Sequence, residues 1–320
     1  MIFHPIFNRY RLEGVGEDER FLRSITGART RREFEGVLAD GLLTSGRLSK
    51  IGELAHIPHH QSEDYYEWID LLEAIDCAGD RFTMVELGAG YGRWITNGYL
   101  AVQRHVDAKI RDIQIVGVEA SQKHFDWMKL HLQDNDLVYN DDLIVRAAIS
   151  SYSGYTLFPS ASAGPPTAAD PGFGLAMIDQ DLSSTTAQRQ LADAFAEGVR
   201  VMTMPNDQKT YDIVPTISIN DLLSRLDADR IVDLIDMDVQ GAEFEAVAAA
   251  IDVINLRVKR MHIGTHSRQI DRALYDLLVR NGWRIKRFFH YASTALADFG
   301  PYEAGDGIIS CTNCRFANGN

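Results

Sequence analysis

The chain has 320 residues, of which 45% are apolar, and a formal net charge of −13 at pH 7. This apolar fraction supports a globular core, while no stretch approaches the roughly 20 apolar residues of a membrane span. The negative charge disfavours a nucleic-acid partner, because such proteins need basic residues to neutralise phosphates.

The cysteines and the N-terminus point to a reducing compartment. There are three cysteines, too few for a disulfide scaffold, and the C-x-x-C spacing of Cys311 and Cys314 lacks the second pair that a structural zinc site needs. Residues 1–5 lack the basic and apolar regions of a signal peptide. The expected location is therefore the cytoplasm.

Residues 1–80 carry helical patterns rather than strands, which predicts a helical extension before a main domain at residues 81–320. Apolar residues recur at helical spacing from Ser62 to Ile75. Basic residues at Arg20–Arg32 are interrupted by glutamates and are expected to form a solvated helix face. A Pro-containing segment carries three histidines, His56, His59 and His60. They could form a metal cluster, but an exposed or hydrogen-bonded loop is the simpler expectation.

Residues 83–92 read TMVELGAGYG, an apolar run that leads into three alternating glycines. This pattern predicts a strand, a tight turn and a helix, and the turn lets backbone approach a small molecule because glycine lacks Cβ. The dinucleotide fingerprint needs a glycine where Arg93 stands. The pattern instead resembles motif I of Rossmann-like methyltransferases that use S-adenosylmethionine (SAM). A turn without a ligand is the alternative. The resemblance implies cofactor contacts from Glu86, Gly88, Ala89 and Gly90.

A second strand is predicted at Ile113–Val118, after a helix over Trp94–Val106. It ends at Glu119, and the distance from the glycine turn fits one strand–helix–strand unit. An acid at this tip can accept hydrogen bonds from both ribose hydroxyls, although a solvated loop acid is the alternative. A helix over Lys123–Gln133 and a third strand over Leu143–Ile149 are expected next.

Residues 151–230 are predicted to be an insertion, since glycines and prolines interrupt the region before a helix at Ala187–Glu197. A run at Thr216–Ile219 then leads into a helix near Asp221–Leu226. A simple crossover needs far fewer residues, and long loops of compact domains are often functional lids. We expect part of this region to cover the substrate; a surface insertion away from the site is the alternative.

The C-terminal part completes the predicted sheet. Residues 231–243 read as a strand, an acidic tip, a glycine turn and a helix start, where Glu243 suits the helix dipole. Val258–Ser267 reads as a strand that ends in a small-residue turn with two histidines. Trp283–His290 and Gly307–Ser310 are expected to form the last two strands, as an antiparallel pair at one edge.

With these segments in order, the chain resembles the FkbM-type methyltransferases over about residues 82–316. In that family the segment near Asp236 commonly reads Ile-Asp-Val-Glu-Gly with a glutamate shortly after, and Gln240 departs from this pattern. The resemblance implies an α/β fold of the Rossmann-like class I methyltransferase type. Its mostly parallel twisted sheet has helices on both faces and an antiparallel edge strand. It also implies SAM as cofactor, with Asp236 at the site and room for adenine beside Ala147 and Ala148.

Ligands of open α/β sheets bind beyond the carboxyl ends of the strands, where the acidic and histidine turns are expected. Methyl transfer from SAM needs an aligned acceptor oxygen and removal of its proton. His266 and His262 are candidate bases because imidazole titrates near neutral pH, although His262 can equally be a core residue of its strand. Asp238 can be the base, orient a histidine, or hold a divalent cation together with a histidine.

The hypothesis is an O-methyltransferase that uses SAM and acts on a hydroxyl, or less readily a carboxylate, of a small molecule or glycan. The substrate class comes from the resemblance. One alternative is a noncatalytic SAM-binding scaffold that works through its helical extension. Another is an NAD-dependent oxidoreductase, which Arg93 disfavours. The acceptor, any metal and the oligomeric state stay open.

Overall fold

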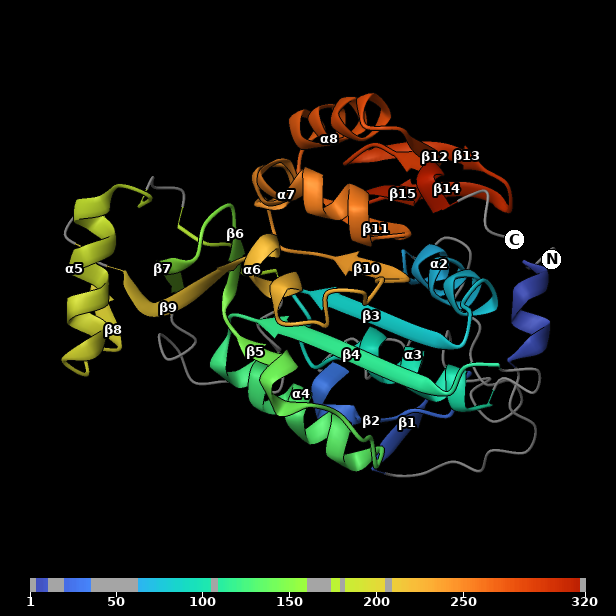
Figure 1. The fold of residues 1–320 in the computed structure, drawn as a ribbon, viewed down its shortest axis with the longest axis horizontal. Helices are drawn as coiled ribbons and strands as arrows, with labels where there is room; N and C mark the ends of the chain where they lie inside the picture. The colour runs from blue at the N-terminus through green and yellow to red at the C-terminus, as the bar shows by residue number, and fades with distance from the viewer. Residues whose placement is uncertain are drawn as a thin grey trace.

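A seven-stranded sheet forms the centre of the molecule (Figure 1). The computed structural model describes residues 4–10, 20–35, 63–104, 109–159, 174–178, 182–204 and 209–316. The strands of the central sheet are β3 (Arg81–Leu87), β4 (Asp112–Glu119), β5 (Ile144–Arg146), β10 (Leu234–Met237), β11 (Arg260–Thr265), β12 (Trp283–Phe289) and β15 (Gly307–Asn313).

The strand order is β12-β15-β11-β10-β3-β4-β5. Pairing is parallel from β11 across to β5, whereas β15 runs antiparallel to both β11 and β12. The order reverses between β3 and β10, which is where open sheets of this kind bind ligands. The topology confirms the Rossmann-like class I methyltransferase fold and the antiparallel pair at the edge.

Helices cover both faces of the sheet. Along a strand, side chains alternate between faces: Met84 joins one apolar core and its neighbour Val85 joins the other. On the Met84 side lie α2 (Asp64–Asp76), α3 (Arg93–Arg104) and α4 (Gln122–Asp134), and on the Val85 side lie α6 (Ile219–Ser224), α7 (Glu243–Arg257) and α8 (Arg268–Arg280).

The N-terminal extension includes the predicted helix α2 but is not helical throughout its described residues. It begins with a 3-10 helix, η1 (Pro5–Arg9), and contains an antiparallel pair, β1 (Phe21–Arg23) and β2 (Arg29–Arg31). The expected helix face at Arg20–Arg32 is therefore wrong. Its arginines bind α4 instead, since Arg31 donates to both carboxylate oxygens of Asp134 at 2.5 and 3.0 Å. The loop histidines lie outside the described residues.

The expected third strand is split in two. After β5, the backbone turns at Ala147, and β6 (Ala148–Ser150) pairs with β9 (Thr210–Ser218) of a second sheet. Most strands of this sheet come from the predicted insertion, and they lie in a lobe beside the central sheet (Figure 1). The lobe also contains β7 (Gly154–Pro159), α5 (Thr185–Ala196) and β8 (Val201–Thr203).

A hairpin that the sequence patterns did not reveal closes the C-terminal part: β13 (Ser293–Ala297) and β14 (Gly300–Ala304). Tyr302 of this hairpin is buried against Tyr66 of α2 and Phe289 of β12. The hairpin and the extension therefore pack together on one side of the sheet. None of the helices described is long and apolar enough to cross a membrane.

Candidate functional site

The glycine turn after β3 is held in a conformation that suits glycine. Gly88 has φ +79°, and a Cβ added there would lie 1.8 Å from the backbone oxygen of Asp238. The backbone amides of Gly88 and Ala89 both donate to the carbonyl of Val118 at 2.9 Å. The turn is therefore fixed between β4 and β10, and any side chain at position 88 would displace it.

Glu86 lies beneath this turn and does not line the cavity. Its carboxylate accepts hydrogen bonds from the backbone amides of Trp94 at 3.2 Å and Ile95 at 2.9 Å, in the first turn of α3. Burial raises the pKa of Glu86 to about 8. Glu86 thus holds the helix start against the turn, which is a supporting role rather than the direct contact that the motif implied. Ala89 is likewise buried in the turn and absent from the cavity wall.

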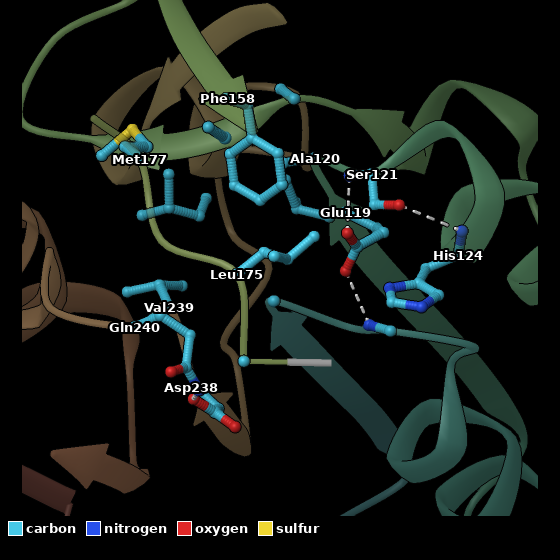
Figure 2. A pocket seen from close by; sticks show the side chains of 17 residues that line it. Glu119, Ala120, Ser121, His124, Phe158, Leu175, Met177, Asp238, Val239 and Gln240 are labelled. Carbon is cyan, nitrogen blue, oxygen red and sulfur yellow. Dashed lines mark hydrogen bonds between the residues drawn. The ribbon is translucent and has the colours of Figure 1, made fainter. Parts of the chain in front are cut away.

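A cavity opens at the carboxyl ends of β3, β4 and β10 (Figure 2). Of the residues expected to bind the cofactor, five line it: Gly88, Gly90, Glu119, Ala147 and Ala148. The insertion supplies an apolar wall that was not predicted residue by residue: Phe158, Gly174, Leu175 and Met177. Part of the insertion therefore lies over the cavity.

Glu119 projects into this cavity from the tip of β4 (Figure 2). One carboxylate oxygen accepts from the amide of Gly90 at 2.8 Å and the other from the amide of Ser121 at 2.7 Å. Burial raises the pKa of Glu119 to about 7. A carboxylate can accept about four hydrogen bonds, so Glu119 keeps acceptor capacity for a ligand while the two amides fix its orientation.

Asp238, Glu243 and His266 form a second group at the cavity, here called the cavity cluster. His266 Nδ1 lies 2.7 Å from Glu243 Oε1, and its Nε2 lies 3.2 Å from Asp238 Oδ1. One ligand atom from each of the three residues lies within 4.8 Å of the others. Asp238 lines the cavity and its side chain is 46% exposed, whereas Glu243 is fully buried.

The turn between β10 and α7 produces this arrangement. Gln240 and Gly241 adopt positive φ values of 56° and 110°, and the amide of Gly241 donates to Glu243 Oε1 at 2.9 Å. Glu243 is the functional candidate that the sequence-based list omitted. Its position in the first turn of a helix, just after an acidic strand tip, could have identified it as a site residue. Gln240 also takes part, donating to Asp238 Oδ1 at 2.9 Å.

The protonation state of His266 follows from these neighbours. Burial lowers the pKa of His266, but the neighbouring carboxylates of Asp238 and Glu243 outweigh it and raise the pKa to about 10. His266 is therefore an imidazolium at neutral pH in this geometry. Further acids surround it: burial and the charges of Asp238 and Asp306 raise the pKa of Glu63 to about 8.

His262 and Asp236, two other predicted site residues, do not reach the cavity. His262 is buried in β11 and its Nδ1 lies 2.7 Å from Asp70 of α2. Asp236 pairs in register with His262 and faces α2 as well. The structure therefore separates His262 from His266, although the sequence places both in one predicted strand and the turn that ends it.

Together, the strand order, the glycine turn, the acidic tip of β4 and the cavity at the carboxyl ends define an enzyme of the Rossmann-like class I methyltransferase type. The family model of the methyltransferase FkbM domain matches residues 88–281, more than half of the chain. The chain belongs to this family and is a methyltransferase.

Comparison with known proteins finds relatives that are also described as methyltransferases. A curated protein from Jannaschia sp. (strain CCS1) that carries a methyltransferase assignment is 26% identical over 253 residues, which are 79% of this chain and 80% of that protein. Similar solved structures are more distant. The methyltransferase FkbM from Methylobacillus flagellatus KT is 14% identical, with a TM-score of 0.37, over 73% of this chain and 44% of that chain. The O-methyltransferase from Bacillus cereus in complex with SAH is 12% identical, with a TM-score of 0.35, over 86% of this chain and 89% of that chain.

Proposed function

We propose that the chain transfers the methyl group of SAM to a hydroxyl oxygen of a small molecule or glycan. The observation that carries the proposal is the cavity that joins the glycine turn and Glu119 to the cavity cluster. The cofactor supplies an electrophilic methyl group on a sulfonium centre. The chain's own residues have to hold the cofactor, align the acceptor and accept its proton.

The cavity fits the nucleoside part of SAM. Gly88 and Gly90 let the backbone of the turn line the cavity directly, and Glu119 offers free acceptor capacity for ribose hydroxyls. Ala147 and Ala148, with the apolar wall of the insertion, leave a flat space for adenine. An NAD-dependent oxidoreductase is disfavoured, because Arg93 begins α3 where the dinucleotide fingerprint needs glycine. Its guanidinium binds Asp64 of α2 at 2.5 Å.

In the cavity cluster, Asp238 is the proposed proton acceptor. His266 carries a proton already, so it orients Asp238 and offsets the charge of Glu243 rather than acting as the base. An acceptor hydroxyl beside Asp238 would lose its proton as the methyl group is transferred. The acids at this end of the cavity favour a neutral hydroxyl over a carboxylate or phosphate acceptor.

A metal version of this mechanism uses the same three side chains. Carboxylates and imidazole are suitable ligands for a divalent cation, and Glu243 Oε2 is buried without a hydrogen-bond partner among the described residues. Such an ion would polarise the acceptor oxygen. Dialysis against a chelator separates the two versions: the metal version loses activity and regains it with the cation, whereas the base version keeps its activity.

Thermal stabilisation by ligands tests the cofactor assignment. S-adenosylhomocysteine should raise the melting temperature while NAD should not, because a ligand that binds only the native state stabilises it. Gly88→Ala should remove the effect, and Gly79→Ala is the matched control because a Cβ there meets nothing within 4 Å. Stabilisation by NAD alone would overturn the assignment. Binding without methyl transfer to a broad panel of acceptors would favour the scaffold alternative.

We also propose a reducing, cytoplasmic location. Cys77, Cys311 and Cys314 are all free, and Cys311 is buried within β15. Non-reducing mass spectrometry of the cellular protein should find three free thiols. An intermolecular disulfide at Cys77 or Cys314 would argue against this location.

A further inference from the structure

A row of polar side chains crosses the central sheet beneath α2, on the face opposite α7. The residues occupy adjoining register positions on five neighbouring strands. They are Glu86 on β3, Asp236 on β10, His262 on β11, Ser310 on β15 and Arg287 on β12. Most of this row is explained by the hydrogen bonds of Glu86 to α3 and by the contacts of Asp70. The Nε2 atom of His262, at the centre of the row beside Asp236, is not.

His262 is fixed in orientation by a carboxylate. Its Nδ1 lies 2.7 Å from Asp70 Oδ2, and Asp70 Oδ1 accepts from Ser310 at 2.7 Å and from Arg287 at 2.9 Å. The side chain of His262 is 2% exposed, and its Nε2 is buried with no hydrogen-bond partner in the described part of the chain. A carboxylate that holds one imidazole nitrogen and leaves the other free is the usual support of a metal-binding histidine.

Two carboxyl groups lie beside this histidine. One oxygen each from Glu67 and Asp236 and one nitrogen of His262 all lie within 4.8 Å of one another. These three residues are here called the buried cluster: Asp236 and His262 are buried, and Glu67 of α2 is partly buried. Burial and nearby carboxyl charges raise the pKa of Glu67 and of Asp236. Arg93 is the nearby cation, but its guanidinium binds Asp64.

We propose that Glu67, Asp236 and His262 bind one divalent first-row transition-metal ion. Two carboxylates and an imidazole suit ions such as Mn²⁺, Fe²⁺ and Zn²⁺. The ion would offset the carboxyl charges that the fold buries here and would use the free nitrogen of His262. It would also join α2 of the N-terminal extension to β10 and β11. The buried cluster does not line the cavity, so this site is structural and does not depend on the proposed methyl transfer.

Binding of Mn²⁺ and Zn²⁺ alone to the chelator-treated full chain tests the proposal. Calorimetry and elemental analysis should find an ion that Glu67→Gln and His262→Gln each lose and that Asp238→Asn retains. Asp238→Asn is the matched control because it changes only the cavity cluster. Mn²⁺ should raise the melting temperature of the wild type and of Asp238→Asn, and should leave that of Glu67→Gln unchanged.

Two results would overturn the proposal. One is a wild-type chain that binds neither ion, which would make the buried cluster a network of shared protons. The other is an ion lost only in Asp238→Asn, which would assign it to the cavity cluster. If His262→Gln fails to fold by circular dichroism, Glu67→Gln decides the question, since Glu67 is only partly buried and the substitution keeps its shape.

Discussion

The cavity cluster and the buried cluster are built alike and stand two residues apart on the chain, at Asp238 and Asp236. At each histidine, a carboxylate lies 2.7 Å from Nδ1: Glu243 of the cavity cluster for His266, and Asp70, next to the buried cluster, for His262. Their surroundings differ. Asp238 is 46% exposed at the cavity, whereas α2 covers Asp236 and leaves it 6% exposed.

This difference shows how position at a strand end decides what a histidine–carboxylate pair can do. Beyond the end of β10, Asp238 is exposed at the cavity, where the proposed mechanism has it accept the proton of the acceptor hydroxyl. Inside the strand, Asp236 is buried beside Glu86, Glu67 and His262, so a charge on it must be neutralised within the protein. Changes in the cavity cluster should therefore affect turnover, and changes in the buried cluster should affect stability.

The largest expected effect is on turnover. Asp238→Asn should lower kcat by about 10²–10⁴-fold, the range for loss of a positioned base. The affinity for S-adenosylhomocysteine should change little, because the lost interaction belongs mainly to the transition state. Steady-state kinetics and calorimetry measure the two quantities. Wild-type turnover in this variant would remove Asp238 from the mechanism.

The counterpart next to the buried cluster, at Asp70, is a loss of stability. Asp70→Ala leaves Arg287 and His262 without their carboxylate, and breaking a buried pair costs about 3–5 kcal/mol. Denaturant unfolding should show this loss, while the affinity of the folded variant for S-adenosylhomocysteine stays near that of the wild type. Asp193→Ala on α5 is the control, since its pair with Arg189 is exposed and contributes little. A loss of less than about 1 kcal/mol in Asp70→Ala would contradict the comparison.

A smaller effect is expected at the end of the cavity that is proposed to hold the cofactor. Glu119→Ala should weaken S-adenosylhomocysteine by about 1–3 kcal/mol, because ligand hydroxyls and the amides of Gly90 and Ser121 lose their acceptor. Calorimetry on Glu119→Ala and the conservative Glu119→Gln measures the change, and the glutamine variant should retain part of the affinity. An unchanged dissociation constant would place Glu119 outside the ribose site.

The last expected effect concerns pH. The folded-state pKa of His266, about 10, is above the unfolded value of about 6.5. Its contribution to stability is therefore complete below pH 6.5 and is lost as the pH rises to about 10. The free energy of unfolding should fall more between pH 7 and pH 10 in the wild type than in His266→Gln. Equal slopes would mean that His266 is not held as an imidazolium.

Much of the cofactor end could be predicted from the sequence. The glycine turn and Glu119 are adjacent to apolar runs of strand length, so local pattern was enough to place them at strand ends. The contacts of Glu86 differ from the cofactor contact that the motif implied, because its carboxylate accepts hydrogen bonds from the amides of α3. The split of the third strand also escaped prediction, since Ala148–Ser150 pairs with β9 about 70 residues later.

The sequence by itself determined most strands of the central sheet, the glycine turns and the acids that follow them, because these depend on apolar periodicity and on glycine within a few residues. Only the tertiary structure decided that His266 lies beside Asp238 of the cavity wall whereas His262 lies beneath α2. His262 meets Asp70, which is 192 positions away, and His266 meets Glu243 across the ends of two strands. Such contacts arise from the packing of α2 and α7 on opposite faces of one sheet, and no local pattern in the chain encodes that packing.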